Sequence, residues 1–386
     1  MGINVNIQSS VVSDSLRRIK NVIKESDSVL SGVLIETDEA SISLRGTNID
    51  STLEIDLPAN ILEQGIAVIP YKPLNDYINA LGNEKINLKD VSKKNNYQLL
   101  ISEIEGESKT KFNCLNHDDF PDTVKCDKLV CSMSIDNFLL MLKMVNKAAA
   151  KDISRPMLSC ILLSIKDNSI TFASMDGYRM HISKSPITTH TDCDLVIPAS
   201  VLISLLGVLS SNGEDVSIYV NERGTLACFA QSNIRFTIRM FDGKYPAYQK
   251  LIDKSMARTR AFTIGAPQMK SAVNKVTAAT KYDTKNPLQV TIMESDDEGT
   301  MVQLYSRGGE VTEDSVNKVL AVNTFRGPEL VLQVSNNLLI DALEVLPADA
   351  VVEISAESVK SPITITAQIQ DISFISVIMP VYQAGK

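Results

Sequence analysis

The sequence predicts an α+β protein made of three similar units, each with antiparallel sheet and two helices. Three observations support this prediction: two landmarks recur along the chain at one interval, an amphipathic helix opens each unit, and alternating strands separated by turn residues follow. The units are expected at residues 1–125, 126–256 and 257–386. Apolar residues make up 44% of the 386 residues, which is enough for several packed cores.

The two landmarks mark the middle and the end of each unit. The first is an apolar strand that runs into a helix, at residues 66–81, 195–206 and 330–343. The second is an apolar or aromatic residue followed by proline, at Phe120-Pro121, Tyr245-Pro246 and Met379-Pro380. Both recur at intervals of about 130 residues, and two independent signals rarely share one period by chance.

A helix with an apolar stripe is predicted near the start of each unit, over residues 13–25, 136–151 and 267–285. In the first of these, Leu16, Ile19 and Ile23 follow helical spacing. Segments such as 41–45 and 169–173 alternate apolar and polar residues, as half-buried strands do. Turn residues at 167–169 and 221–224 separate such strands, so hairpins of antiparallel sheet are expected.

Positive charge is concentrated on these opening helices. The whole chain has a net charge of −8, which argues against a protein that coats nucleic acid with its entire surface. Each opening helix, however, has more basic than acidic residues. Basic residues are predicted to share one helix face at Arg17, Lys20 and Lys24, at Lys143, Lys147 and Lys151, and at Lys270 and Lys281 with Asn274 and Thr277 between them. The pattern suits loose contact with a phosphate backbone, although an ordinary solvated helix face remains the alternative.

Other functional classes lack their signatures. The six cysteines form no C-x-x-C pair and have no histidine at ligand spacing, so reduced thiols and no metal or other cofactor are expected. The histidines His117, His181 and His190 have no phased nucleophile, and the phosphate loop G-x-x-x-x-G-K is absent, so no enzyme is predicted. No apolar run is long enough to span a bilayer and no signal peptide is recognised, which favours the cytoplasm and no membrane.

Four segments resemble one family, the bacterial β-type sliding clamp of the replicative DNA polymerase. They are Ser154–Leu158, Ala173–Met180, Gly243–Leu251 and Val377–Val381. The resemblance implies a DNA clamp fold and a head-to-tail ring of two subunits, with helices lining the hole and double-stranded DNA passing through it without sequence recognition. The residues that it implies for DNA contact are Arg17, Lys20, Lys24, Lys143, Lys147, Lys151, Arg155, Lys270 and Lys281.

The resemblance also implies a cleft that binds short peptide motifs of the replicative polymerase and other clamp-binding proteins. The matching positions are Leu158, Met175, Gly177, Tyr178, Arg179, Met180, Pro246, Lys250, Leu251, Val377, Ile378, Met379, Pro380 and Val381. Methionine and leucine side chains suit an adaptable apolar floor, and Arg179 and Lys250 are expected to make polar contacts at its rim. The alternative is that the methionines only fill a core.

An interface between subunits is implied between the first and third units. Lys109 and Lys111 match the basic side of this interface, and Glu310, Glu313 and Asp314 match the acidic side. Because the chain lacks a phosphate loop, a separate ATP-dependent clamp loader would have to open the ring. The rival interpretation is a triplicated protein-binding scaffold that does not encircle DNA.

Overall fold

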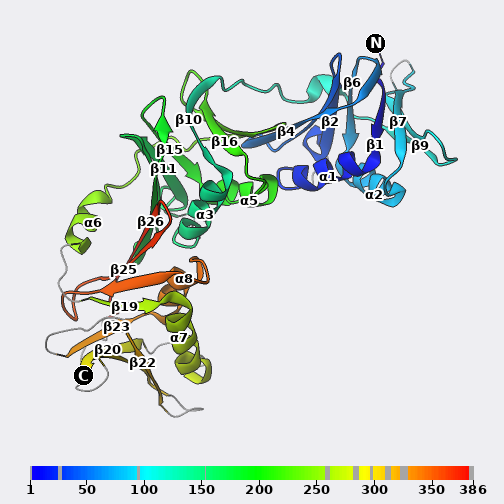
Figure 1. The fold of residues 1–386 in the computed structure, drawn as a ribbon. Helices are drawn as coiled ribbons and strands as arrows, with labels where there is room; N and C mark the ends of the chain where they lie inside the picture. The colour runs from blue at the N-terminus through cyan, green and yellow to red at the C-terminus, as the bar shows by residue number, and fades with distance from the viewer. Residues whose placement is uncertain are drawn as a thin grey trace. The chain divides into compact units, whose positions relative to one another are not determined.

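The computed structural model describes residues 2–24, 28–93, 96–152, 154–256, 261–280, 287–295, 299–308, 314–321 and 329–381 (Figure 1). The chain forms two compact units. Unit 1 comprises Met1–Asp136 and Ser200–Met240, and unit 2 comprises Asn137–Ala199 and Phe241–Lys386. Among the described helices, none is long and apolar enough to cross a membrane.

One order of elements occurs three times: a strand, a helix, three antiparallel strands, a further strand, a second helix and three final strands. The first repeat contains β1 (Asn4–Gln8), α1 (Ser9–Ile19), β2 (Gly32–Thr37), β3 (Ser41–Thr47), β4 (Ser51–Pro58), β5 (Asn60–Glu63), β6 (Ile66–Pro70), α2 (Tyr71–Leu81), β7 (Lys85–Asp90), β8 (Gln98–Glu103) and β9 (Lys109–Asn113). The short strand β5 is an addition to the common order. Both predicted landmarks of this repeat lie where expected.

The second repeat follows the same order, with the short strand β14 and the helix α6 as additions. It contains β10 (Lys128–Ser134), α3 (Ile135–Asn146), β11 (Cys160–Lys166), β12 (Ser169–Met175), β13 (Arg179–Pro186), β14 (Thr188–Thr189), β15 (Cys193–Pro198), α4 (Ala199–Leu202), α5 (Leu205–Val208), β16 (Asp215–Val220), β17 (Leu226–Gln231), β18 (Ile234–Arg239) and α6 (Gln249–Met256). The second predicted helix is divided here into the short helices α4 and α5.

The third repeat completes the pattern. It contains β19 (Ala261–Gly265), α7 (Ala266–Thr280), β20 (Leu288–Ser295), β21 (Gly299–Ser306), β22 (Ser315–Leu320), β23 (Leu330–Val334), α8 (Asn336–Glu344), β24 (Val351–Ser355), β25 (Ile363–Ile369) and β26 (Ile372–Ile378). The prediction of three similar α+β domains is therefore confirmed. The exact boundaries at residues 125 and 256 stay predictions.

Antiparallel pairing joins successive repeats within each unit. In unit 1 the strand order β10-β16-β17-β18-β4-β3-β2-β6 places the last strand of the second repeat against β4 of the first. Ile234 there faces Ile55. In unit 2 the order β15-β11-β12-β13-β26-β25-β24-β19 repeats this arrangement, with Ile182 facing Ile375. The remaining sheets are β5-β1-β7-β8-β9 in unit 1 and β22-β21-β20-β23 in unit 2.

Helix α1 shows how the apolar stripe is used. Val12, Leu16 and Ile19 are almost completely buried against the sheets, and each such burial contributes about 1.5–3 kcal/mol. Gly46 on β3 permits the close approach, because a Cβ there would lie 2.6 Å from Cγ2 of Ile19. The opposite face of the helix stays in water, as the sequence pattern indicates.

Two of the three opening helices start or end before the predicted residues. Helix α1 begins at Ser9 directly after β1 and ends at Ile19, so Lys24 lies beyond it. Helix α3 ends at Asn146, and carbonyl groups of its last turns accept hydrogen bonds from side chains of the sheet. Lys147 and Lys151 therefore lie after the helix rather than on it.

The predicted solvent-exposed face of α7 is wrong at one position. Thr277 was expected to lie between Lys270 and Lys281 on the solvated side, but it is only 6% exposed. Its hydroxyl donates to the carbonyl of Val273, as a threonine inside a helix can do. Asn274 is exposed as expected, and Lys281 lies outside the described residues.

Candidate DNA-facing helices and peptide site

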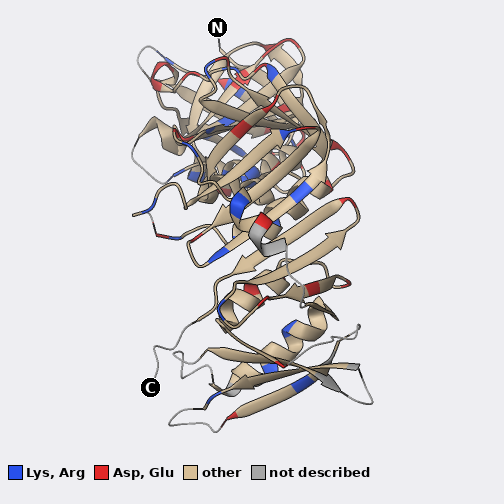
Figure 2. Cartoon of the chain, turned by 90° about the vertical axis from the view of Figure 1, so that its left-hand side faces the viewer, with Lys and Arg blue, Asp and Glu red and all other residues tan. Residues whose placement is uncertain are grey.

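The basic residues of the first repeat are accessible. Arg17, Lys20 and Lys24 are all exposed. Arg17 contacts Asp14 at 2.8 Å, but both side chains are largely in water, where such a pair contributes little. Figure 2 shows lysine and arginine interspersed with acidic residues along the chain, so that local placement matters more than net charge.

Arg18, which the sequence did not single out, has a structural role instead. Its guanidinium donates to the carbonyl of Val208 and, at 2.9 Å, to the hydroxyl of Ser210. These contacts join the end of α1 to the end of α5 within unit 1. The side chain is half-buried, so this cation is not available to a ligand in the way that Arg17 and Lys20 are.

The basic residues assigned in the second and third repeats fall into two groups. Lys143, Lys151 and Arg155 are exposed. Arg155 also borders the predicted peptide site, since a Cβ added at Gly177 would lie 3.6 Å from its Nη1 atom. Lys147 and Lys270, by contrast, are held in ion pairs with helix α8.

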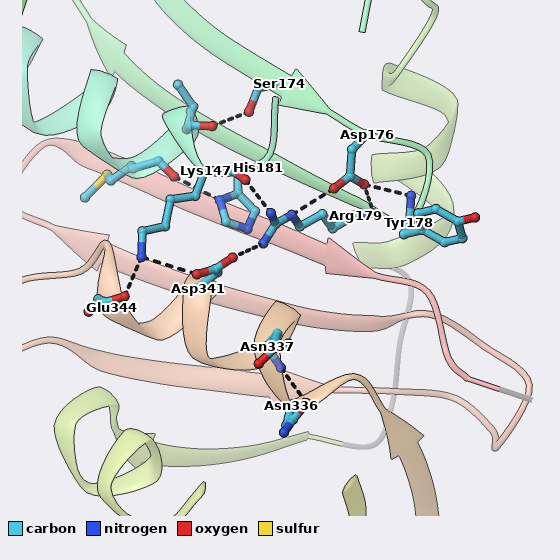
Figure 3. Close-up of polar contacts among 12 residues, drawn as sticks. Lys147, Ser174, Asp176, Tyr178, Arg179, His181, Asn336, Asn337, Asp341 and Glu344 are labelled. Atoms are coloured by element: carbon cyan, nitrogen blue, oxygen red, sulfur yellow. Dashed lines mark hydrogen bonds and ion pairs between the residues drawn. The ribbon is translucent and has the colours of Figure 1, made fainter. Parts of the chain in front are cut away.

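These ion pairs belong to a connected group of six charged side chains, which we call the α8 cluster. Figure 3 labels five of its members, all except Lys270. It consists of Asp176, Arg179, Lys147, Asp341, Glu344 and Lys270. Arg179 donates through Nε to Asp176 at 3.1 Å and through Nη1 to Asp341 at 2.6 Å. Lys147 donates to Asp341 at 3.2 Å and also to Glu344. Lys270 lies 3.3 Å from the other oxygen of Glu344.

The surroundings keep these groups charged. Hydrogen bonds from Lys147 and Lys270 hold the pKa of Glu344 below its usual value. Burial opposes ionisation of Asp341, but the bonds from Arg179 and Lys147 outweigh it and lower its pKa. Burial likewise opposes the charge of Lys147, yet its bonds to Glu344 and Asp341 raise its pKa.

Polar side chains of the sheet bind the last carbonyl groups of α3. Ser174 donates to Val145, His181 lies 3.0 Å from the Met144 oxygen through Nδ1, and Ser183 donates to Met141 at 3.3 Å. The guanidinium of Arg179 adds a bond to the carbonyl of Lys147. Because a carbonyl can only accept, Nδ1 of His181 carries the proton. Burial lowers the pKa of His181 to about 4, so the ring is neutral at physiological pH.

Most of the predicted peptide-site residues come together around one apolar cluster in unit 2. Met175, Met180 and Val377 are buried in it, with Leu158 packed against its side. Tyr245 and Ile252, which the sequence did not assign to the site, contribute from the segment around Pro246 and from α6. Both belong to the same segment after β18 as Pro246, Lys250 and Leu251. Their place in that segment was the feature of the sequence from which they could have been assigned.

Large side chains at the edge of this cluster remain in water. Tyr178 is 70% exposed, and Leu251 and Met379 are about half exposed. Gly177 has φ +96, a conformation that favours glycine, and Asp176 accepts from the backbone N–H groups of Tyr178 and Arg179 at 2.9 and 3.0 Å. The backbone of Met379 donates to Tyr178 at 2.8 Å, and that of Val381 to Gln333 at 3.0 Å. Lys250 is exposed and Pro380 is partly buried.

Two residues assigned to the peptide site do not present their side chains as predicted. Ile378 is completely buried, and strand alternation turns it to the face opposite Val377. Arg179 is only 8% exposed and is occupied by the α8 cluster, so its guanidinium is not a free contact at the rim. It instead anchors the turn that presents Tyr178.

Of the residues assigned to the subunit interface, Lys109 and Lys111 project from β9 into water. Asp314 precedes β22, accepts a hydrogen bond from the hydroxyl of Tyr305 at 2.5 Å, and is exposed. Glu310 and Glu313 lie outside the described residues. Among the residues that the structure describes, no group of His, Cys, Asp and Glu is arranged to hold a metal ion.

Comparisons with known proteins agree with this fold. Residues 3–124 match the family model of the DNA polymerase III beta subunit, N-terminal domain, and residues 132–247 match that of its central domain. A beta sliding clamp of Staphylococcus aureus is 23% identical over 334 residues, which cover 84% of each chain. The DNA polymerase sliding clamp of Bacillus subtilis has a TM-score of 0.89 at 19% identity, covering 99% of this chain and 100% of that one. The beta subunit of Streptococcus pyogenes has a TM-score of 0.86 with the same coverage.

The threefold α+β repeat, with strands of each repeat completing the sheet of the one before, defines the class of DNA clamp proteins. The chain belongs to the family of the DNA polymerase III beta subunit, the beta sliding clamps.

Proposed function

We propose that this chain is a DNA polymerase processivity factor, a sliding clamp without catalytic activity that encircles duplex DNA in the cytoplasm. The observation that carries the proposal is the repeated element order, in which each repeat opens with a helix whose apolar stripe is buried and whose other face or following turn bears basic residues. Contacts of this kind are sequence-independent and exchangeable, as sliding requires.

The sheet edges support a closed ring of two copies. Within the chain, the third strand after each opening helix pairs with the last strand of the next repeat, as β4 with β18 and β13 with β26. Two strands in these positions are left without such a partner: β22, the third strand after the last opening helix, and β9, the last strand of the first repeat. Both lie at the edge of their sheets. Pairing β22 of one copy with β9 of another would continue the same pairing from subunit to subunit. Lys109 and Lys111 on β9 and Asp314 beside β22 carry opposite charges.

The peptide site would tether the replicative polymerase and other clamp-binding proteins. An apolar cluster with Tyr178, Leu251 and Met379 exposed at its edge suits a short segment with bulky apolar side chains. A separate ATP-dependent loader would open the ring.

Light scattering over a range of concentrations tests the ring, for which we expect a mass near twice 42.3 kDa. Loaded protein should remain on circular duplex DNA and dissociate when the circle is cut. Reversal of charge at Lys109 and Lys111 should weaken the dimer. Adding Asp314→Lys, which reverses the charge on the other side of the interface, should restore it. A monomer at every concentration would instead favour the protein-binding scaffold.

A further inference from the structure

Helix α8 presents two carboxylates, Asp341 and Glu344, about one turn apart. Both contact lysines that the family resemblance assigns to DNA. Nζ of Lys147 lies 3.2 Å from Asp341 and also contacts Glu344, as Figure 3 shows. Nζ of Lys270 lies 3.3 Å from the second oxygen of Glu344. One carboxylate therefore bridges lysines from the second and third repeats.

The α8 cluster has three acidic and three basic members, so it carries no net charge at neutral pH. Its members are only partly in water: the side chain of Lys147 is 36% exposed, and that of Lys270 is similar. Ion pairs shielded in this way are screened less by salt than fully exposed ones.

Lys143 and Lys151 differ from Lys147 and Lys270. Both are exposed, and within the described part of the chain no ion pair holds either of them. Such a lysine can bind a phosphate and release a counterion from the DNA, which is the source of salt-dependent affinity. A lysine that must first leave a carboxylate exchanges one ion pair for another, so it contributes much less to the affinity for DNA and to its salt dependence.

We infer that Glu344, supported by Asp341, is a positioning residue that holds Lys147 and Lys270 in competition with DNA phosphate and so weakens the grip on the duplex. The inference rests on the proposed function, since it requires that these lysines face DNA. It adds a specific role for acidic residues: they set how much of the basic surface is available, and therefore how readily the protein moves along DNA.

The test is Glu344→Gln, a nearly isosteric change that leaves both lysines in place. Binding to a linear duplex is measured by fluorescence anisotropy over a range of salt concentrations. We expect several-fold tighter binding and a slope of log K against log salt that steepens by about 1 for each lysine released. Glu353→Gln is the matched control, because it removes the same charge from an exposed position on β24 of the same unit.

Further variants separate the possible outcomes. Because Lys147 keeps its contact with Asp341 when Glu344 is replaced, the double variant Lys270→Gln with Glu344→Gln should lose more of the gain than the double variant Lys147→Gln with Glu344→Gln. Thermal unfolding verifies that each variant is folded. If Lys143→Gln weakens DNA binding while Glu344→Gln leaves affinity and slope unchanged, the inference is wrong and the proposed function stands. The same holds if Glu353→Gln tightens binding as much as Glu344→Gln. If no variant, nor the natural chain, binds DNA in a salt-dependent way, the proposed function itself fails.

Discussion

Asp341 of helix α8 accepts a hydrogen bond from Arg179 at 2.6 Å, although the two residues are 162 positions apart. This contact ties the third repeat to the turn that carries Tyr178, at the edge of the proposed peptide site. Because Asp341 also binds Lys147, one side chain contacts both the turn that carries Tyr178 and the segment directly after α3 that is proposed to face DNA.

Replacing Asp341 by Asn should lower the stability of unit 2 by about 2 kcal/mol, because the poorly exposed Arg179 loses its strongest partner. Asp194→Asn is the control, since the Lys166–Asp194 pair is about half exposed and should contribute less than about 1 kcal/mol. Urea denaturation followed by circular dichroism measures both. Equal losses in the two variants would show that the Asp341 contact is not a stabilising one.

Acidification should destabilise the chain through His181. Its pKa is lowered to about 4 by burial, while an unfolded histidine titrates near 6.5, so the unfolded state binds the proton first. The stability contributed by the neutral ring is complete above about pH 6.5 and is lost as the pH falls toward 4, on the order of 3 kcal/mol.

The measurement compares the free energy of unfolding between pH 7 and pH 4 for the natural chain and for His181→Asn, which keeps a donor for the Met144 carbonyl. The carboxylates contribute equally to the pH dependence of both proteins. The difference between the two pH profiles therefore gives the contribution of His181. Parallel pH profiles would assign the loss of stability to other groups.

Neutralising Lys143 and Lys151 together should weaken binding to duplex DNA and reduce the salt slope by about 2, without loss of folding, because both side chains are exposed. Neutralising Lys147 alone should change the slope less, since that lysine is already paired. Salt titrations of the two variants check this order. A larger effect at Lys147 would contradict it.

Removal of residues 379–386 should abolish binding of a clamp-binding peptide while the dimer persists, because the peptide-site cluster and the β9 and β22 edges lie on different strands. Met379→Ala is the milder form and should weaken the peptide by about tenfold, as expected for an anchor at the edge of an apolar site. Val359→Ala alters a similarly exposed apolar residue elsewhere and is the control. Isothermal titration calorimetry measures the affinity for the peptide. If that affinity is unchanged after the truncation, this surface is not part of the peptide site.

The apolar cluster around the proposed peptide site was partly predictable from the sequence, because the assigned residues are grouped in four short segments. Met175, Met180 and Val377 lie in one cluster as predicted. Ile378 lies on the other face, because alternation along β26 turns adjacent residues in opposite directions. The role of Arg179 could not be predicted, since its partner Asp341 comes from another repeat.

The sequence by itself determined the order of elements in all three repeats, because apolar periodicity and turn residues act over a few neighbouring positions. It also located the basic opening helices. The tertiary structure alone decided which basic residues are free and which are paired. The spacing of Asp341 and Glu344 places them on one side of α8, but only pairing of β13 with β26 brings that helix to Lys147. Ion pairs between distant segments depend on which strands pair to join the sheets, and the local sequence pattern does not specify that pairing.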